Sequence, residues 1–203
     1  FWAYSNQHII YLQDKGGDEN WRVYSVDLVK GDIKDLTPFE KVAAQVDGVS
    51  HRIPDEIIVA LNNRNAQYHD LHRVNIRTGQ MDLLAENNEY AGYVTDDDYN
   101  VRFAMKMTPD GGSEIFKPTA KGGWESFMKI GMEDAMTTNP LGLDKEGKTL
   151  YMVDSRRRNT AALAALNIAD ELFRTRDLNQ DRDGQLAERA GEIERMLDRV
   201  LMA

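Results

Sequence analysis

The sequence predicts a mainly β protein: a partial β-propeller of about three and a half four-stranded blades, followed by a short α-helical tail. Strand-like runs recur at a regular interval, similar glycine turns follow them, and helical periodicity is confined to the last residues. A period of roughly 43 to 49 residues with about four short strands per unit is typical of propeller blades. A β-sandwich with evenly spaced hairpins is the alternative interpretation.

The leading strand of each repeat is rich in β-branched, aliphatic or aromatic residues and is bounded by turn residues. We expect these strands at residues 9–14, 57–62, 101–105 and 149–154. A further strand follows each of them, at residues 23–28, 71–76, 114–116 and 162–166. Gly31 and Gly79 stand at matching places after two of these strands, where a tight hairpin often needs positive φ.

Composition excludes several classes of site. The chain has 203 residues and a net charge of −9, which argues against non-specific nucleic-acid binding. It has no cysteine, which excludes disulfides and thiolate catalysis. The lack of cysteine fits a reducing, cytoplasmic compartment, although a secreted protein can also lack cysteine, so the compartment stays open. No apolar run approaches the roughly 18 residues of a membrane span, so no membrane partner is expected. The start at Phe1, inside an apolar run, suggests a fragment or a cleaved product.

Several short sequence motifs resemble those of a known family. Residues 11–20, YLQDKGGDEN, resemble a stretch found in bacterial prolyl oligopeptidase-family serine peptidases. Five further segments resemble motifs of this family and occur in the same order: residues 36–39, 68–72, 109–112, 154–156 and 159–162. The resemblance covers about residues 1–168 and implies the N-terminal propeller domain. Residues 169–203 form a separate unit, for which we expect a helix-loop-helix.

The resemblance implies a propeller that gates or docks peptide substrates for an α/β-hydrolase domain. That domain carries a Ser-Asp-His triad with its serine in a G-x-S-x-G elbow. This chain contains no G-x-S-x-G, so we assign no catalytic residue and expect no activity from it alone. The implied partner is a peptide substrate, reached through the hydrolase domain. A free-standing, WD40-like scaffold for partner proteins is an alternative.

Most titratable clusters favour structural roles. His69 and His72 lie in a predicted strand, where an odd spacing places them on opposite faces. Residues 96–98, three aspartates, favour a solvated hairpin turn over a cation site. The acid pairs at 18–19 and 55–56 lie in loops, so we do not assign them to a substrate amino terminus.

Arginines and tryptophans are interpreted in the same way. The arginines at 156–158 could clamp a carboxylate, but they favour a loop surface. Trp2, Trp21 and Trp124 lie in or beside predicted strands, so we expect all three to pack in the core between blades.

The C-terminal residues follow a different pattern. We expect the strand pattern to continue to about residue 168, and a helix from about 170. A second helix is expected at about 187–201, because seven apolar residues share one helical face: Leu186, Ala190, Ile193, Met196, Leu197, Val200 and Leu201.

The segment between these helices resembles an EF-hand calcium loop. Its candidate ligands are Asp177, Asn179, Asp181, Asp183 and Glu188. A loop beginning at Asp177 puts Arg182 where glycine is needed, and one beginning at Asn179 puts Ala190 in the place of the bidentate carboxylate. We therefore expect no cofactor, or weak calcium binding; the alternative is an Asx-rich turn that caps the helix. A calcium-binding or protein-interaction module is the corresponding alternative function.

Overall fold

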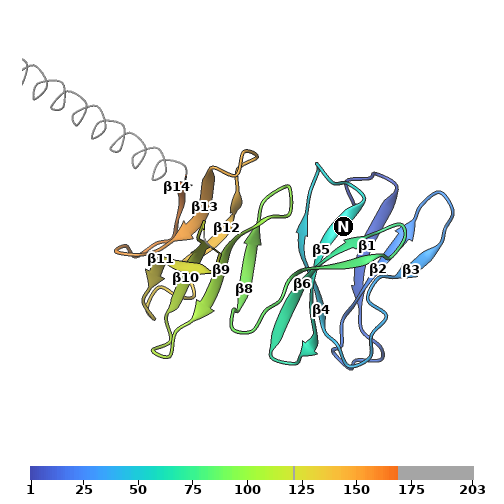
Figure 1. The fold of residues 1–203 in the computed structure, drawn as a ribbon, viewed down its shortest axis with the longest axis horizontal. Coiled ribbons are helices and arrows are strands. Elements are labelled where there is room, and N and C mark those ends of the chain that lie inside the picture. Colours follow the sequence, from blue (N-terminus) through green and yellow to red (C-terminus); the bar gives the residue numbers. More distant parts are fainter. Residues whose placement is uncertain (121, 169–203) are drawn as a thin grey trace, which may run out of the picture.

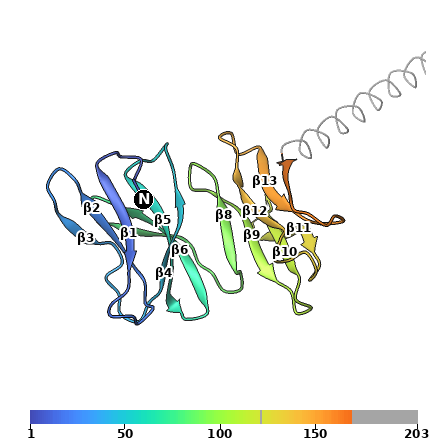
Figure 2. The ribbon, with the colours of Figure 1, turned by 180° about the vertical axis from the view of Figure 1, so that it is seen from behind.

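The computed structural model describes residues 1–120 and 122–168, which form four antiparallel sheets (Figures 1 and 2). Within each sheet the strands lie side by side in chain order. Sheet 1 contains β1 (His8–Gln13), β2 (Arg22–Asp27) and β3 (Ile33–Asp35). Sheet 2 contains β4 (Ala44–Val49), β5 (Glu56–Asn65), β6 (Tyr68–Asn75) and β7 (Met81–Ala85). Sheet 3 contains β8 (Gly92–Thr95), β9 (Val101–Met107), β10 (Ser113–Pro118) and β11 (Trp124–Ile130). Sheet 4 contains β12 (Asn139–Leu143), β13 (Thr149–Asp154) and β14 (Ala162–Asn167).

This arrangement confirms the predicted repeat. The four predicted leading strands correspond to β1, β5, β9 and β13, and the following strands to β2, β6, β10 and β14. Each pair is antiparallel, for example with Ile10 opposite Ser25 and Val59 opposite His72. Separate meandering sheets, each packed on the next, distinguish this architecture from a two-sheet sandwich.

The two predicted glycine turns also share one geometry. Gly31 has a φ of 78° and Gly79 a φ of 79°. Their amides donate to the carbonyls of Asp27 at 2.7 Å and Asn75 at 2.8 Å. The side chains of Asp27 and Asn75 then accept backbone amides of the same turn, as Asx residues do in tight turns. Glycine is required here because left-handed backbone is costly for residues that carry a Cβ.

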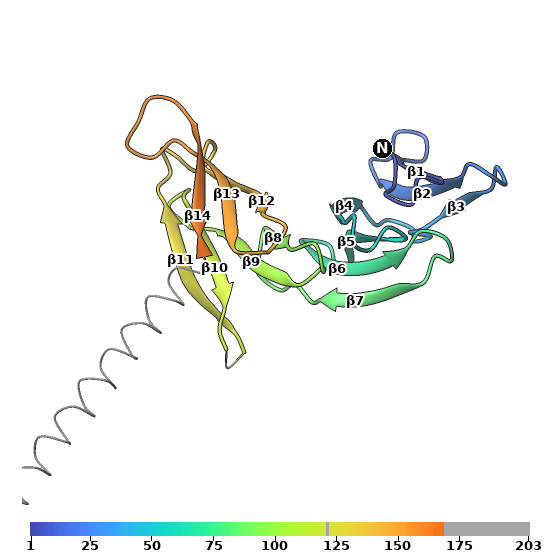
Figure 3. The ribbon, with the colours of Figure 1, turned by 90° about the horizontal axis from the view of Figure 1, so that it is seen from above.

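The four sheets follow one another around an arc (Figure 3). The first strands of sheets 2, 3 and 4, which are β4, β8 and β12, lie on its concave side, and the outer strands β3, β7 and β11 lie on its convex side. Residues 1–3 take the equivalent inner place in sheet 1, because Trp2 bridges Ile9 and the Ile10 amide donates to the Phe1 carbonyl at 2.9 Å. The inner strands are therefore the surface that a propeller presents to its axis.

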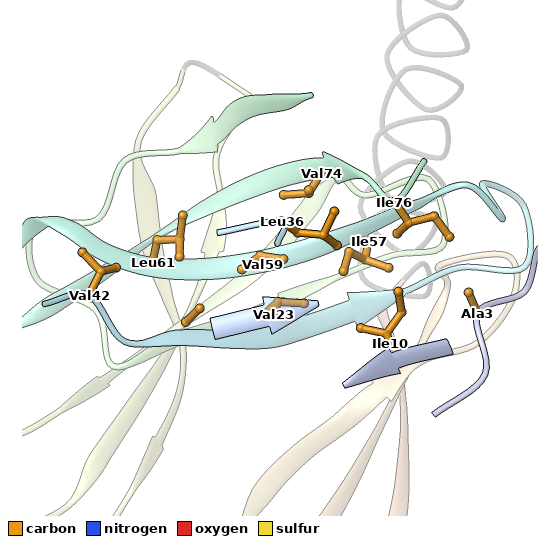
Figure 4. Close-up of a cluster of buried hydrophobic side chains, with 11 residues drawn as sticks. Ala3, Ile10, Val23, Leu36, Val42, Ile57, Val59, Leu61, Val74 and Ile76 are labelled. Carbon is orange, nitrogen blue, oxygen red and sulfur yellow. The ribbon is translucent and has the colours of Figure 1, made fainter. Parts of the chain in front are cut away.

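Apolar side chains fill the space between successive sheets. The central strand β5 is buried on both faces, which explains its continuous apolar sequence. Ile57, Val59 and Leu61 point toward sheet 1, where they meet Ile10 and Val23 (Figure 4). Ile58 and Ala60 point the other way, into a cluster that contains Tyr90, Tyr93 and Tyr99 from the sheet 3 side. A third cluster, with Phe103, Ile115, Leu150 and Met152, joins sheets 3 and 4.

Two of the three tryptophan predictions are wrong. Trp124 packs between sheets as expected, with its ring centroid 5.5 Å from that of Tyr90. Trp2 is instead 64% exposed and Trp21 is 44% exposed. Trp2 pairs with Ile9, and among the described residues no further sheet covers the face of sheet 1 that points away from sheet 2. Aromatic character alone could not indicate which blade face lacks a neighbour.

The predicted tail lies outside the described residues. This applies to the helices expected from about 170 and at 187–201, and to the EF-hand-like loop. The strand predicted before the tail is confirmed as β14, which ends at Asn167. In the part of the chain that the structure describes, no helix has the length and apolar character of a membrane span.

Candidate functional site

A pocket of about 360 Å³ opens on the inner strands and is the principal site candidate. Its walls come from three sheets: residues 47–49 of β4, residues 93–95 of β8, and residues 140–143 in β12. The turn after β8 closes one side with Asp96, Asp97 and Tyr99. Because three blades contribute to it, the pocket depends on how the sheets are arranged and not on any one motif.

Asp47 is the most distinctive side chain of this pocket. Alternation along β4 buries Ala44 and leaves Asp47 on the inner wall. The side chain is exposed to solvent by surface area, yet protein atoms crowd it on most sides. This crowding disfavours the charged form and raises the pKa of the Asp47 carboxyl to about 6. A carboxyl with a raised pKa in a pocket is a recognised mark of a functional position.

The aspartates at 96–98 form the predicted turn between β8 and β9. Their carboxylates make more hydrogen bonds and ion pairs with the protein than a solvated turn requires. Asp96 accepts hydrogen bonds from the Asn100 amide at 2.9 Å and from Arg102 at 3.1 Å. Burial opposes its ionisation, but these hydrogen bonds outweigh burial, and the Asp96 pKa is lowered. The Asp97 carboxylate lies 3.5 Å from Nδ1 of His51, and the Asp98 carboxylate accepts a hydrogen bond from the Arg52 guanidinium at 2.8 Å.

These contacts join neighbouring blades at one rim of the pocket. The Ser50 hydroxyl donates to the Asp97 carbonyl at 2.6 Å, and the Tyr99 hydroxyl donates to the Glu56 carbonyl at 2.7 Å. Arg52 of sheet 2 also donates to the Lys145 carbonyl in the β12–β13 turn at 2.6 Å. The loops that follow β4, β8 and β12 are thus connected, which fixes the pocket walls relative to one another.

The two histidines of β6 point to opposite faces of the strand, as the strand spacing predicts, so they cannot bind one shared ligand. His72 is buried, with Nδ1 3.2 Å from the Asp70 carbonyl. His69 lines a small cavity of about 40 Å³ beside Asp47, its Nε2 is buried without a partner, and burial lowers its pKa.

The two acid pairs were both predicted in loops, but Glu56 is the first residue of strand β5, so that prediction is wrong for it. Asp18 accepts the amides of Lys15 and Asn20 within the β1–β2 loop, at 3.2 and 3.1 Å. Asp55 pairs with Arg77 at 2.8 Å, and Glu56 forms a short ion pair with Arg73. The side chains of Asp18, Asp55 and Glu56 therefore all have partners within the protein.

Arg156, the first of the three predicted loop arginines, is held by its own loop. Its guanidinium donates to both carboxylate oxygens of Asp154, at 3.0 and 2.9 Å. These hydrogen bonds lower the pKa of Asp154 to about 2. Arg156 therefore does bind a carboxylate, but that carboxylate is the side chain of Asp154 and not a ligand.

Two groups of candidate residues remain, the calcium ligands of the tail and the pocket residue Asp47. The calcium candidates Asp177, Asn179, Asp181, Asp183 and Glu188 lie outside the described residues, so this site stays a prediction. Asp47 was missed by the sequence analysis, although the alternation of residues 44–49, AQVDGV, indicates a half-buried strand. Its position on the inner wall becomes evident only when three sheets are assembled.

Comparisons with known proteins identify relatives that match most of the chain. No family model matches it. Dipeptidyl aminopeptidase BIII from Pseudoxanthomonas mexicana is 46% identical over 193 residues, covering 94% of this chain and 28% of that protein. Dipeptidyl peptidase family member 6 from Caenorhabditis elegans is 25% identical over 166 residues, covering 75% of this chain and 22% of that protein. The chain therefore spans less than a third of either relative.

The stronger match also bears on the C-terminal segment. Because it covers 94% of the chain, it extends beyond residue 168, where the described part ends. At least part of the tail sequence is thus shared with this relative.

Solved structures show the same fold. A structure from a study of two prolyl endopeptidases aligns with a TM-score of 0.52 at 18% identity, covering 81% of this chain and 24% of that one. TolB from Acinetobacter baumannii aligns with a TM-score of 0.54 at 11% identity, covering 80% of this chain and 39% of that one. An oligogalacturonate lyase from Vibrio parahaemolyticus aligns with a TM-score of 0.52 at 12% identity, covering 82% of this chain and 48% of that one. The sequence matches and this fold together support the relation of the chain to the propeller domain of the prolyl oligopeptidase and dipeptidyl peptidase family.

Proposed function

We propose that this chain is the non-catalytic propeller part of a prolyl oligopeptidase-family serine peptidase, in which it docks or gates peptide substrates for a hydrolase domain. The observation that carries the proposal is the 46% identity to a dipeptidyl aminopeptidase over nearly the whole chain. The proposed docking surface is the pocket on β4, β8 and β12, because it is concave, polar at one side and built from three blades.

Rigidity supports a docking role. The loop contacts of Ser50, Arg52 and Tyr99 connect successive blades at the pocket rim. A pre-formed wall loses little conformational freedom when a peptide binds, which favours affinity. An opening between blades would instead have to break these contacts, so the described section acts as a fixed wall.

A segment exchange tests this proposal. The part of dipeptidyl aminopeptidase BIII that matches this chain is replaced by this chain, and hydrolysis of a dipeptidyl chromogenic substrate and of a folded protein is measured. We expect the exchanged enzyme to hydrolyse the small substrate and to leave the folded protein intact, with the same ratio between the two activities as measured for the unexchanged enzyme in parallel. A well-folded exchanged enzyme that hydrolyses neither substrate, or peptide hydrolysis by this chain alone, would contradict the proposal.

A further inference from the structure

The inner pocket combines an apolar wall with an acidic side. The apolar part comes from all three sheets and includes Val49, Val94, Met105 and Leu141. The acidic part consists of Asp47, Asp96 and Asp97. A ligand that fills such a pocket needs an apolar stem and a positively charged end.

The three carboxylates differ in their protein partners. Asp96 is neutralised by Arg102 at 3.1 Å, and Asp97 faces His51 at 3.5 Å. Asp47 has neither a hydrogen-bond donor nor an ion-pair partner among the described residues. Asp47 is therefore the carboxylate of this pocket for which no protein partner is found among the described residues.

The surroundings of Asp47 favour a cation in particular. Crowding by protein disfavours its charged form, and His69 in the adjoining small cavity is itself kept from protonation by burial. An opposite charge within about 4–6 Å stabilises an ionised carboxylate in such surroundings. A bound cation would thus supply the partner that the protein does not supply.

We infer that the inner pocket binds a lysine or arginine side chain of the docked peptide, with Asp47 pairing with its cationic end. The aliphatic stem would lie along the wall formed by Val49, Met105 and Leu141. The pocket volume of about 360 Å³ is at the lower end of the range for small-ligand sites, which suits one side chain and its backbone. This inference rests on the proposed docking function and specifies which peptides the pocket prefers.

The test compares three tripeptide amides by titration calorimetry with the 203-residue chain. The first is N-acetylated with a central lysine, the second is N-acetylated with a central norleucine, and the third is trialanine with a free amino terminus. We expect the lysine peptide to bind about tenfold more tightly than the norleucine peptide, the ratio expected for one charge-assisted contact. Asp47→Asn should abolish this preference, whereas Asp82→Asn, on the outer strand β7, should retain it.

The outcomes separate this inference from the proposed function. If the lysine and norleucine peptides bind equally, or if Asp47→Asn retains the preference, the inference is wrong while peptide docking stands. If binding through Asp47 is found only with the free amino terminus, the side-chain assignment is also wrong. If no peptide binds to the parent chain, docking and the inference fail together. Circular dichroism of both variants confirms that they are folded.

Discussion

Asp70 allows a sharp test of what holds the central sheet together. Only 3% of it is exposed, and its carboxylate accepts two hydrogen bonds from Arg64, both at 2.8 Å, and the Asn87 amide at 2.7 Å. Arg64 also donates to the Asn87 carbonyl at 2.6 Å. The group thus joins the β5–β6 hairpin to the loop between β7 and β8.

The substitution Asp70→Asn removes the charge and places an amide donor against the guanidinium. Breaking a buried ion pair costs about 3–5 kcal/mol. The Arg64 side chain is 38% exposed and can turn toward water, so we expect the lower end, about 3 kcal/mol, in the free energy of unfolding. Asp82→Asn, on the exposed surface of β7, is the matched control and should change stability by less than about 0.5 kcal/mol.

The pH dependence gives a second readout of the same group. Burial opposes ionisation of Asp70, but hydrogen bonds from Arg64 and Asn87 outweigh burial, and its pKa is lowered in the folded chain. Its stabilising contribution is therefore fully present above the unfolded pKa, about 3.9, and is lost as pH falls through the folded pKa. Urea denaturation followed by tryptophan fluorescence should show the full difference between parent and Asp70→Asn at pH 7 and a smaller difference at pH 3. A loss below about 1 kcal/mol at pH 7, or a difference that grows toward pH 3, would refute the reasoning.

Three further predictions concern the blade contacts, the repeat turns and the tail. Tyr99→Phe removes the hydrogen bond to the Glu56 carbonyl and should lower the free energy of unfolding by about 1 kcal/mol in the same urea assay; an unchanged midpoint would show that this inter-blade contact is unimportant. Gly79→Ala places a Cβ in a turn with a φ of 79° and should lower the free energy of unfolding by about 1–2 kcal/mol. Gly92→Ala is its control, because an added Cβ there meets only Met105 at 3.5 Å without positive φ; equal losses would contradict the turn argument. Calcium titration of the chain should give weak, roughly millimolar binding that Asp181→Ala with Asp183→Ala abolishes, and absence of heat in the parent would leave a helix-capping turn.

The repeat could be predicted because each blade carries its own local signals. β5 is apolar on both faces because its sheet lies between two others. Its apolar run from Ile57 to Leu61 can be recognised in the sequence. The turns at Gly31 and Gly79 could be recognised in the sequence because both have positive φ, a conformation that glycine adopts at least cost. Such features depend on residues that are close along the chain.

The site could not be predicted in the same way, because it depends on residues from different blades. The pocket that Asp47 lines exists only when β4, β8 and β12 are assembled, and the burial that raises the pKa of Asp47 comes from the folded structure. Arg52 reaches Lys145 across two sheets, a contact that no local pattern indicates. The wrong predictions for Trp2 and Trp21 have a similar cause, since an aromatic side chain does not reveal whether a neighbouring blade covers it.

The central claim is that peptides dock on the inner strands of a non-catalytic propeller section. Amide chemical shifts of the isotope-labelled chain, measured during titration with the N-acetylated lysine peptide, test it most directly. The account predicts shift changes at residues 47–49, 93–97 and 141–143, with the outer strands β3, β7 and β11 unaffected. Changes confined to those outer strands or to the exposed face around Trp2 would contradict it.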